Sequence, residues 1–302
     1  MPKVIAICNQ KGGVGKTTTA LNLAAFLAIG GARVLLIDLD PQANATGGLG
    51  VEKGEVIHSI YDALLSERIT FESVILPTKV VNLWLIPSQV ALSGAEVELV
   101  SMENRESRLR EAMKSVRSSY DFIFIDCPPS LGLLTVNAMT AADTILIPTQ
   151  CEYFAMEGLS QLLESIRLVK QNLNSGLLVE GILLTMADFR TKLTNDVIHE
   201  IRRFFGSQVY EVVIPRSVRL SEAPSHGLPI VLYDPTSAGA HAYQLVAQKI
   251  KENINARDSR SGQGNPSPYT GWESRAESTA GDNQNPTPSD KSWSLPTQTE
   301  PE

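Results

Sequence analysis

The residues best suited to chemistry lie between Lys11 and Thr18, in the run Lys-Gly-Gly-Val-Gly-Lys-Thr-Thr. The glycines at 12, 13 and 15 allow the backbone to wrap closely around an anion with its N–H groups pointing inward. A short apolar run precedes this segment and an amphipathic run follows it, which is the strand–loop–helix context of a phosphate-binding loop. The alternative, a glycine-rich turn with a solvated lysine, explains that context less well. The candidate nucleotide contacts are Lys11, Gly12, Gly13, Val14, Gly15, Lys16, Thr17 and Thr18.

Two side chains of this loop have expected roles at the phosphates. Lys16 should reach the β- and γ-phosphates of ATP, and the Thr17 hydroxyl should bind Mg²⁺. The helix that begins near Lys16 adds its partial positive charge. The standard pattern G-x-x-x-x-G-K-[ST] fails at one position, because Gln10 stands where its first glycine belongs. A second lysine, Lys11, follows Gln10, so the loop carries an extra cation.

Acidic residues follow two other apolar runs. Asp126 ends the run that begins at Phe122, and Asp40 follows the run Val34–Asp38. An aspartate directly after a buried strand can hold Mg²⁺ through water, which suits Asp126. Asp40 lies in a loop that could sense the γ-phosphate and position the attacking water. Alternatively, both carboxylates only cap the turns that follow them.

These residues need a scaffold that brings several strand ends together, and the chain predicts one. Helical spacing appears in Thr17–Ile29 and Ser160–Leu173, and short β-branched runs alternate with such segments. This alternation predicts an α/β fold with a doubly wound, mostly parallel sheet, helices on both faces, and ligands at the carboxyl ends of its strands. The expected strands are Val4–Ile7, Val34–Asp38, Leu83–Ile86, Phe122–Asp126, Thr144–Pro148, Val179–Thr185 and Val209–Ile214.

Composition divides the chain of 302 residues near position 256. We predict a folded domain over residues 1–255 and a disordered polar tail over 256–302, because the tail has too few apolar residues to offset the entropy of ordering it. Cys8, Cys127 and Cys151 each lie in or beside an apolar run without CxxC spacing, which favours buried free thiols. No apolar run approaches the ~18 residues of a membrane span, so we expect a cytoplasmic protein.

The net charge and its distribution bear on whether this chain could bind nucleic acid. The formal net charge of −7 argues against non-specific nucleic-acid binding by the molecule as a whole. Between Met186 and Leu220, however, the sequence contains six basic residues and four acidic ones. An acidic total therefore does not exclude a basic face.

Several longer motifs resemble those of one protein family. The segments KGGVGKTTTA, LIDLDPQANAT, FIDCPPSLGLLT, CEYFAMEGLSQL and IPRSVRLSEAPSHGLPI are similar to those of the ParA/Soj chromosome-partitioning ATPases. These belong to the deviant Walker A (SIMIBI) group of P-loop NTPases, together with MinD and nitrogenase reductase. The similarity extends from about residue 3 to about residue 252. The first motif is shared across the group, whereas the last two are more specific to the partition branch.

The resemblance implies roles for individual residues. It implies that Lys11 reaches across an ATP-sandwich homodimer to the partner's phosphates, and that Gly12 stays small because two loops meet there. Such a cation supplied in trans would make hydrolysis depend on dimerisation. The remaining implied roles are activation of water and metal contact by Asp40, metal binding by Asp126, adenine contact by Pro215 and Arg216, and DNA contact by Arg190 and Arg219.

The function that the resemblance implies is an Mg²⁺-dependent ATPase switch. Its ATP dimer would bind non-specific double-stranded DNA of the nucleoid, and a ParB/Spo0J-type partner would stimulate hydrolysis, for chromosome or plasmid segregation. One alternative is a MinD-like membrane-positioning ATPase, although the acidic, proline-containing end of the chain is unlike a basic amphipathic helix. An electron-transferring reductase would need cluster-ligating cysteines, for which the spacing is unconvincing. A regulator of cell division or transcription on the same scaffold stays open.

Overall fold

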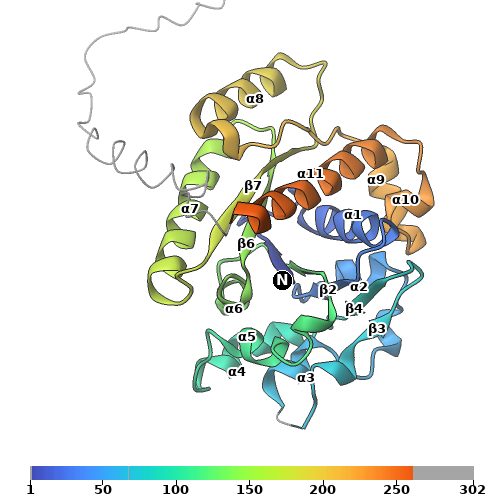
Figure 1. Cartoon of the computed structure of the whole chain (residues 1–302), viewed down its shortest axis with the longest axis vertical. Helices are drawn as coiled ribbons and strands as arrows, with labels where there is room; N and C mark the ends of the chain where they lie inside the picture. Colours follow the sequence, from blue (N-terminus) through green and yellow to red (C-terminus); the bar gives the residue numbers. More distant parts are fainter. Residues whose placement is uncertain (1, 67, 261–302) are drawn as a thin grey trace, which may run out of the picture. The chain divides into compact units, whose positions relative to one another are not determined.

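The computed structural model describes residues 2–66 and 68–260. The chain divides into two units, Met1–Asn265 and Pro266–Glu302, and every described residue belongs to the first. Figure 1 shows this unit with its elements labelled. The last described helix ends at Arg260 and so includes residues 256–260, which were predicted to belong to the tail; the rest of the predicted tail, residues 261–302, lies outside the described residues.

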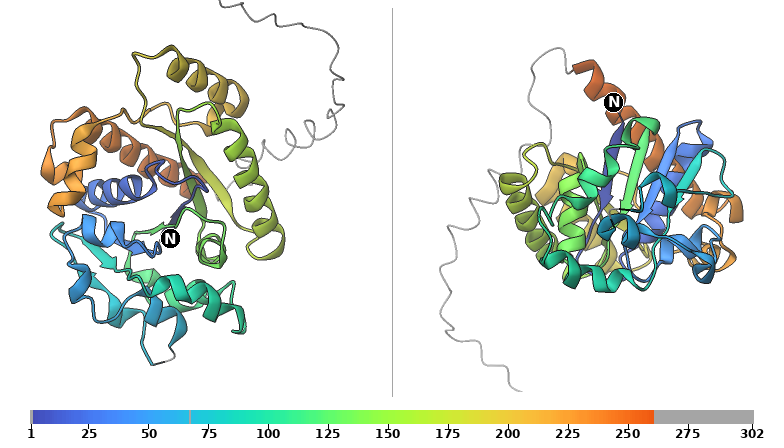
Figure 2. Two further views of the ribbon diagram at one scale, coloured as in Figure 1. Left: turned by 180° about the vertical axis from the view of Figure 1, so that it is seen from behind. Right: turned by 90° about the horizontal axis from the view of Figure 1, so that it is seen from below.

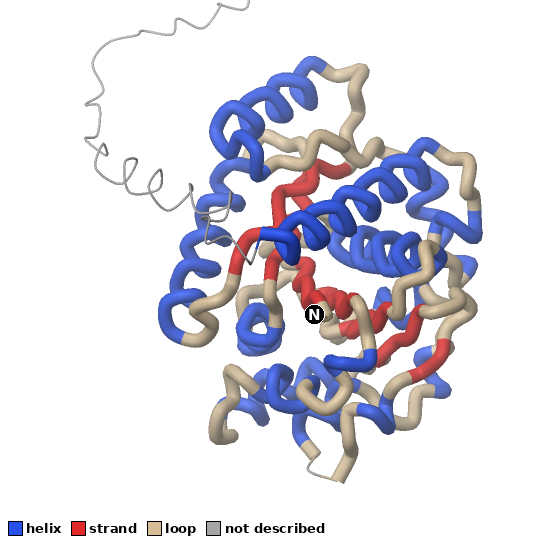
Figure 3. Tube along the Cα trace, viewed as in Figure 1, coloured by secondary structure: helices blue, strands red, loops and turns tan. Residues whose placement is uncertain are grey.

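Within the described residues, seven strands form one sheet in the order β3-β4-β2-β5-β1-β6-β7. Every neighbouring pair is parallel except β3 and β4, which are antiparallel. Figure 3 shows these strands in red among the helices. The strands are β1 (Lys3–Ile7), β2 (Val34–Asp38), β3 (Leu76–Pro77), β4 (Leu83–Ile86), β5 (Phe122–Asp126), β6 (Thr144–Gln150) and β7 (Leu178–Thr185).

Helices cover both faces of the sheet, so the predicted doubly wound α/β class is confirmed (Figures 1 and 2). On one face α1 packs against the central strands and is itself covered by α11, whereas α6 and α7 pack on the other face. The α-helices are α1 (Lys16–Ile29), α2 (Asn44–Gly48), α3 (Ile60–Leu65), α4 (Leu92–Val100), α5 (Arg108–Met113), α6 (Leu133–Ala141), α7 (Ala155–Asn172), α8 (Lys192–Phe205), α9 (Val218–Glu222), α10 (Ile230–Tyr233) and α11 (Ala238–Arg260). The 3₁₀ turns are η1 (Lys53–Glu55), η2 (Glu72–Val74), η3 (Arg117–Ser119), η4 (Gly206–Gln208) and η5 (Ala223–His226).

The central strands are buried on both faces, which explains their continuous apolar sequences. All residues of β2 and β5 are buried, including the aspartates that end them. The register places Asp126 opposite Ile7 of β1 and opposite Asp38 of β2. Three carboxyl strand ends therefore meet at one edge of the sheet, where a doubly wound fold binds its ligand.

One predicted strand is wrong. Val209–Ile214 runs beside β7 but forms only isolated bridges there, between Ile182 and Val209 and between Ala187 and Pro215. The Glu211 carbonyl instead accepts a hydrogen bond from the Arg202 guanidinium of α8, at 2.8 Å. The backbone N atoms of Tyr210 and Ile214 donate to the β7 carbonyls of Ile182 and Leu184, so the segment is joined to β7 near its two ends without a continuous ladder.

Candidate functional site

The segment between β1 and α1 forms the predicted loop. Gly13 and Gly15 adopt positive φ angles of 74° and 86°, a left-handed conformation that favours glycine. Gly12 differs, because a Cβ atom added there would meet nothing within 4 Å. The fold of a single chain therefore requires glycine at 13 and 15 but gives no steric reason for glycine at 12.

Lys16 occupies the first turn of α1 and is 7% exposed. Its ammonium donates a hydrogen bond to the backbone carbonyl of Lys11, with 2.9 Å between Nζ and O. Burial lowers the pKa of Lys16, while the negative charges of Asp126 and Asp40 act in the opposite direction. The first turn of α1 contains no acidic residue. A buried cation and a helix N-terminus thus converge on the loop, an arrangement suited to phosphate.

Asp126 lies at the end of β5 with its carboxylate fully buried. Apart from a contact with the Thr17 side chain, neither of its oxygens has a hydrogen-bond partner within the described part of the chain. Burial, followed by repulsion from Asp38, raises the pKa of Asp126 well above its ordinary value, although the Thr17 contact lowers it. A buried carboxylate whose one nearby side-chain donor is Thr17 fits a bound cation, because a cation would compensate the cost of burying negative charge.

Asp38 is the structural partner that sequence reasoning missed. Its Oδ2 accepts hydrogen bonds of 2.7 Å from both the backbone N and the hydroxyl of Thr46. Burial raises the pKa of Asp38 to about 6. These bonds fix the loop that carries Asp40, whose Oδ1 accepts a 2.9 Å bond from the Gln42 backbone N. The sequence signal for this role was the pair of aspartates at 38 and 40. Asp38 ends β2, so the two carboxylates have different positions and could have been assigned different roles.

The donor set fits Mg²⁺ bound together with nucleotide. Among residues 2–66 and 68–260, no group of three or more His, Cys, Asp or Glu side chains is placed to hold a metal ion by itself. Mg²⁺ is usually bound by one or two carboxylates together with substrate phosphates and water. Asp126, Asp40 and the half-buried Thr17 are the residues that would hold it, and it would neutralise charge on the transferring phosphoryl group.

A pocket of about 240 Å³ opens beside the loop. Gly15 and Thr18 form one side of it, and Pro215 and Arg216 form another. The structure therefore brings the two predicted adenine contacts next to the phosphate loop, although they lie far apart in the sequence. The remaining lining residues are Thr185, Met186, Ile214, Ser217, Leu220, Ser221, Pro224 and Tyr243.

The side chain of Lys11 contacts an aromatic ring outside the loop. Its Nζ lies 5.9 Å from the centroid of the Phe154 ring, a cation–π contact. Phe154 and the adjacent Tyr153 are 60% and 76% exposed and pack edge to face. The second lysine of the loop thus contacts an exposed aromatic surface, whereas Lys16 is buried and bonded within the loop.

The two predicted DNA contacts lie outside the nucleotide pocket. Arg190 follows β7, and its guanidinium donates to both oxygens of Asp188, at 2.8 and 2.7 Å. Arg219 of α9 pairs with Glu222 at 3.0 Å and with Asp234 at 3.5 Å. Both arginines are largely exposed, and both have acidic partners in their own chain.

The cysteines are buried free thiols, as predicted. Cys8 and Cys127 follow the neighbouring strands β1 and β5, with their sulfur atoms 3.2 Å apart. Burial raises the pKa of Cys127, so these thiols act as packing groups beside the phosphate loop. Within the described residues, no helix is both long and apolar enough to cross a membrane.

Comparison with known proteins adds independent evidence. A family model described as an AAA domain matches residues 2–179. The sporulation initiation inhibitor protein Soj of Bacillus subtilis is 56% identical over 253 residues, covering 84% of this chain and 100% of that protein. The chromosome partitioning protein ParA of Myxococcus xanthus is 52% identical, covering 85% of this chain and 91% of that protein. The crystal structure of cobyrinic acid a,c-diamide synthase from Mycobacterium smegmatis, with a bound ATP analogue and magnesium, matches with a TM-score of 0.75 and 33% identity, covering 89% and 99% of the two chains.

Fold, loop and comparisons together define an Mg²⁺-dependent P-loop ATPase of the deviant Walker A class. Within that class, the chain belongs to the ParA/Soj family of chromosome-partitioning ATPases.

Proposed function

We propose that this protein is a switch that dimerises when it binds ATP, holds nucleoid DNA as the dimer, and releases it after hydrolysis. A ParB/Spo0J-type partner would stimulate hydrolysis, and the cycle would serve the segregation of a chromosome or plasmid. The protein would act in the cytoplasm, associated with the nucleoid. Family membership supports the proposal, and one observation carries it: the loop has two lysines with different contacts, Lys16 with the Lys11 carbonyl inside the loop and Lys11 with the exposed Phe154 ring.

Dimerisation through ATP is supported by the position of Lys11. Lys16 serves the phosphates of its own chain, whereas Lys11 lies over Phe154 at an exposed aromatic surface. A lysine in that position can leave its ring contact, worth about 0.5–1 kcal/mol at an exposed site, when a partner's phosphate offers a stronger one. Gly12 agrees with this proposal, because its own chain leaves space for a larger residue there.

Hydrolysis would use the carboxylates at the strand ends. Asp40 would orient and activate the attacking water, since it is attached to a loop that Asp38 holds in place. Asp126 would hold Mg²⁺ near the β- and γ-phosphates. The in-trans Lys11 would stabilise charge on the transferring phosphoryl group, so that hydrolysis requires the dimer.

DNA binding would use phosphate contacts from Arg190 and Arg219. Both guanidinium groups are exposed, and a dimer carries two copies of each. Contacts of this kind ignore base sequence and weaken steeply with salt.

The test compares nucleotide states on DNA fragments of unrelated sequence. ATP-loaded protein should retain each fragment with similar affinity, and ADP-loaded protein should retain none. Arg219→Glu should lose DNA while ATP-dependent dimerisation survives. Equal retention in both nucleotide states, or joint loss of DNA and dimer in the variant, would contradict the proposal.

A further inference from the structure

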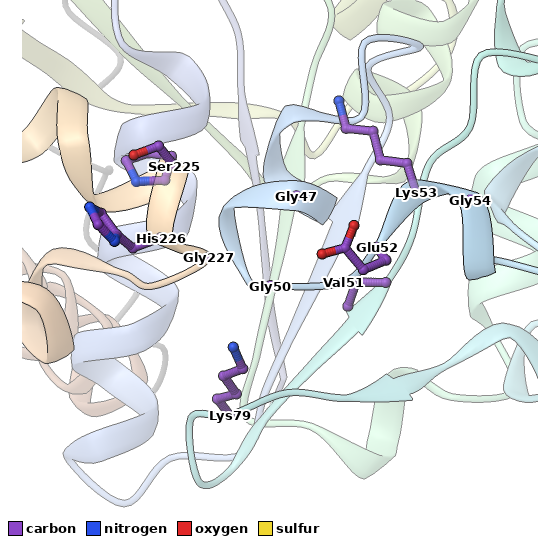
Figure 4. A pocket seen from close by; sticks show the side chains of 11 residues that line it. Gly47, Gly50, Val51, Glu52, Lys53, Gly54, Lys79, Ser225, His226 and Gly227 are labelled. Atoms are coloured by element: carbon purple, nitrogen blue, oxygen red, sulfur yellow. The ribbon is translucent and has the colours of Figure 1, made fainter.

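A second cavity, of about 430 Å³, lies between α2–η1 and η5. Figure 4 shows its two walls: one contains Gly47, Gly50 and Glu52, and the other contains Ser225 and His226. Lys79, from the turn between β3 and β4, extends into it from a third segment. Pro224 lines both this cavity and the nucleotide pocket, whereas the residues named above line this cavity alone.

Backbone contact holds the walls together. Gly50 and Gly227 have φ angles of 77° and 63°, and a Cβ on Gly227 would lie 2.5 Å from the Gly50 Cα. A Cβ on Gly50 would lie 2.9 Å from the Lys79 Nζ and 3.0 Å from the Gly227 carbonyl. The cavity therefore depends on two glycines at a close chain crossing, and is not a gap left by mobile surface side chains.

The charges in the cavity favour an anion. The Lys79 ammonium points toward Gly50 and makes no hydrogen bond or ion pair with any residue that the structure describes. Lys53 adds a second positive charge, but its ammonium is bound to the Gln42 carbonyl at 2.6 Å. His226 contributes ring nitrogens as further hydrogen-bonding groups. Glu52 is the one acidic residue of the lining, so the cavity keeps an excess of positive charge.

A chain of contacts joins this cavity to Arg219. The Arg219 guanidinium pairs with Glu222, and the Tyr233 hydroxyl donates to the same Glu222 oxygen at 3.2 Å. The Tyr233 ring in turn stacks on the His226 ring, with centroids 4.9 Å apart. Because α9 and η5 are consecutive, Arg219 and His226 lie about two helical turns apart, or about 10 Å.

We propose that this cavity binds a phosphate of the DNA backbone, with Lys79 and His226 as its donors and Glu52 as an opposing charge. The proposal rests on the DNA binding proposed above and extends its path beyond Arg219. The cavity and Arg219 would therefore be close enough to contact neighbouring phosphates of one DNA strand.

The experiment measures the affinity of the ATP-loaded protein for a short DNA duplex over a series of salt concentrations. Lys79→Ala should weaken binding by about threefold to tenfold. It should also reduce the slope of the logarithm of the binding constant against the logarithm of the salt concentration, by about one per cavity. Glu52→Gln should strengthen binding by a similar factor. Lys249→Ala is the matched control, because Lys249 is an exposed lysine of α11 outside the cavity, and it should bind as wild type does.

The outcomes separate this proposal from the one on which it rests. If wild type retains no DNA, the proposed function fails and this assignment fails with it. If wild type retains DNA and Lys79→Ala retains it equally, only the cavity assignment is wrong. Dimer formation is measured in parallel, and joint loss of dimer and DNA in Lys79→Ala would also overturn the assignment.

A second measurement distinguishes DNA from a small anion. Inorganic phosphate is titrated into protein saturated with ADP and Mg²⁺, and the amide resonances of Gly50 and Gly227 are followed. The duplex should shift both resonances of the ATP-loaded protein, and Lys79→Ala should abolish that shift. Inorganic phosphate could shift the two amide resonances while Lys79→Ala binds DNA as tightly as wild type does. In that case the cavity is a small-anion site and the DNA assignment is overturned.

Discussion

The Lys16 ammonium donates a hydrogen bond to the Lys11 carbonyl, with 2.9 Å between the two atoms. This bond closes the phosphate loop on itself, because it joins the residue at its end to the residue at its start. The side chain of Lys11 is left to lie over Phe154. We expect a bound phosphate to replace the Lys11 carbonyl as the acceptor of the Lys16 ammonium. The Lys11 side chain would stay available to a second chain.

Gly12→Val tests whether a partner loop meets this one. The variant should fold and bind ATP as wild type does, because a Cβ at this position meets nothing within 4 Å of its own chain. It should stay monomeric with ATP, since added bulk can only collide with the partner. Light scattering measures the mass, and a fluorescent ATP analogue measures affinity. A normal ATP-dependent dimer would remove Gly12 from the proposed interface.

Asp40 can be separated into a chemical and a structural role. Asp40→Ala should bind ATP and stay dimeric without releasing phosphate. Asp40→Asn is the matched variant, because its amide oxygen can still accept the Gln42 backbone N–H but the group carries no negative charge. Both variants should lose hydrolysis, measured as phosphate release. Activity in the asparagine variant alone would show that Asp40 only holds its turn.

Asp188 should restrain the DNA contact of Arg190. The ion pair has two hydrogen bonds, and it lowers the pKa of Asp188 to about 2. Asp188→Asn keeps an acceptor for the Arg190 backbone N but removes the competing charge. DNA affinity of the ATP form should rise a few-fold, whereas Arg190→Ala should lower it. Weaker binding by Asp188→Asn would mean that the pair positions Arg190 for DNA.

One hydrogen bond connects α1 to α11 in the core. The Thr19 and Tyr243 hydroxyl oxygens are 3.1 Å apart, and both residues are buried. Tyr243→Phe should lower the free energy of unfolding by about 1–2 kcal/mol, because it leaves the Thr19 hydroxyl unpaired. Adding Thr19→Val should restore much of that loss, since replacing both partners by apolar groups is nearly neutral. Chemical denaturation measures both, and additive losses would count against this account.

Local sequence was sufficient where a segment is fully buried. Val34–Asp38 and Phe122–Asp126 form strands over the predicted bounds, because both faces of each are covered and every position favours apolar residues. Val209–Ile214 is also rich in β-branched residues but forms only isolated bridges with β7, and its Glu211 carbonyl bonds to Arg202 of α8 and not to the sheet. The two-residue β3 is too short to leave a pattern.

Local sequence also predicted the part of the site that is continuous in the chain. The phosphate loop is contiguous, so its residue types and spacing predicted it. The contact of Lys11 with Phe154 and the cavity at Lys79 join residues that are distant along the chain. Such pairs depend on the folded path of the backbone, and no periodicity in one segment reveals them.

The central claim is that each ATP is bound by residues of both subunits. Its most direct test is the molecular mass in solution of the Lys11→Ala variant in the presence of ATP, compared with that of Lys16→Ala. The account predicts that Lys11→Ala binds ATP with wild-type affinity but remains a monomer, because the lost cation serves the partner's phosphates. Lys16→Ala should fail to bind ATP and therefore also remain a monomer. A normal dimer of Lys11→Ala, or loss of its ATP affinity equal to that of Lys16→Ala, would contradict the claim that Lys11 acts across the interface.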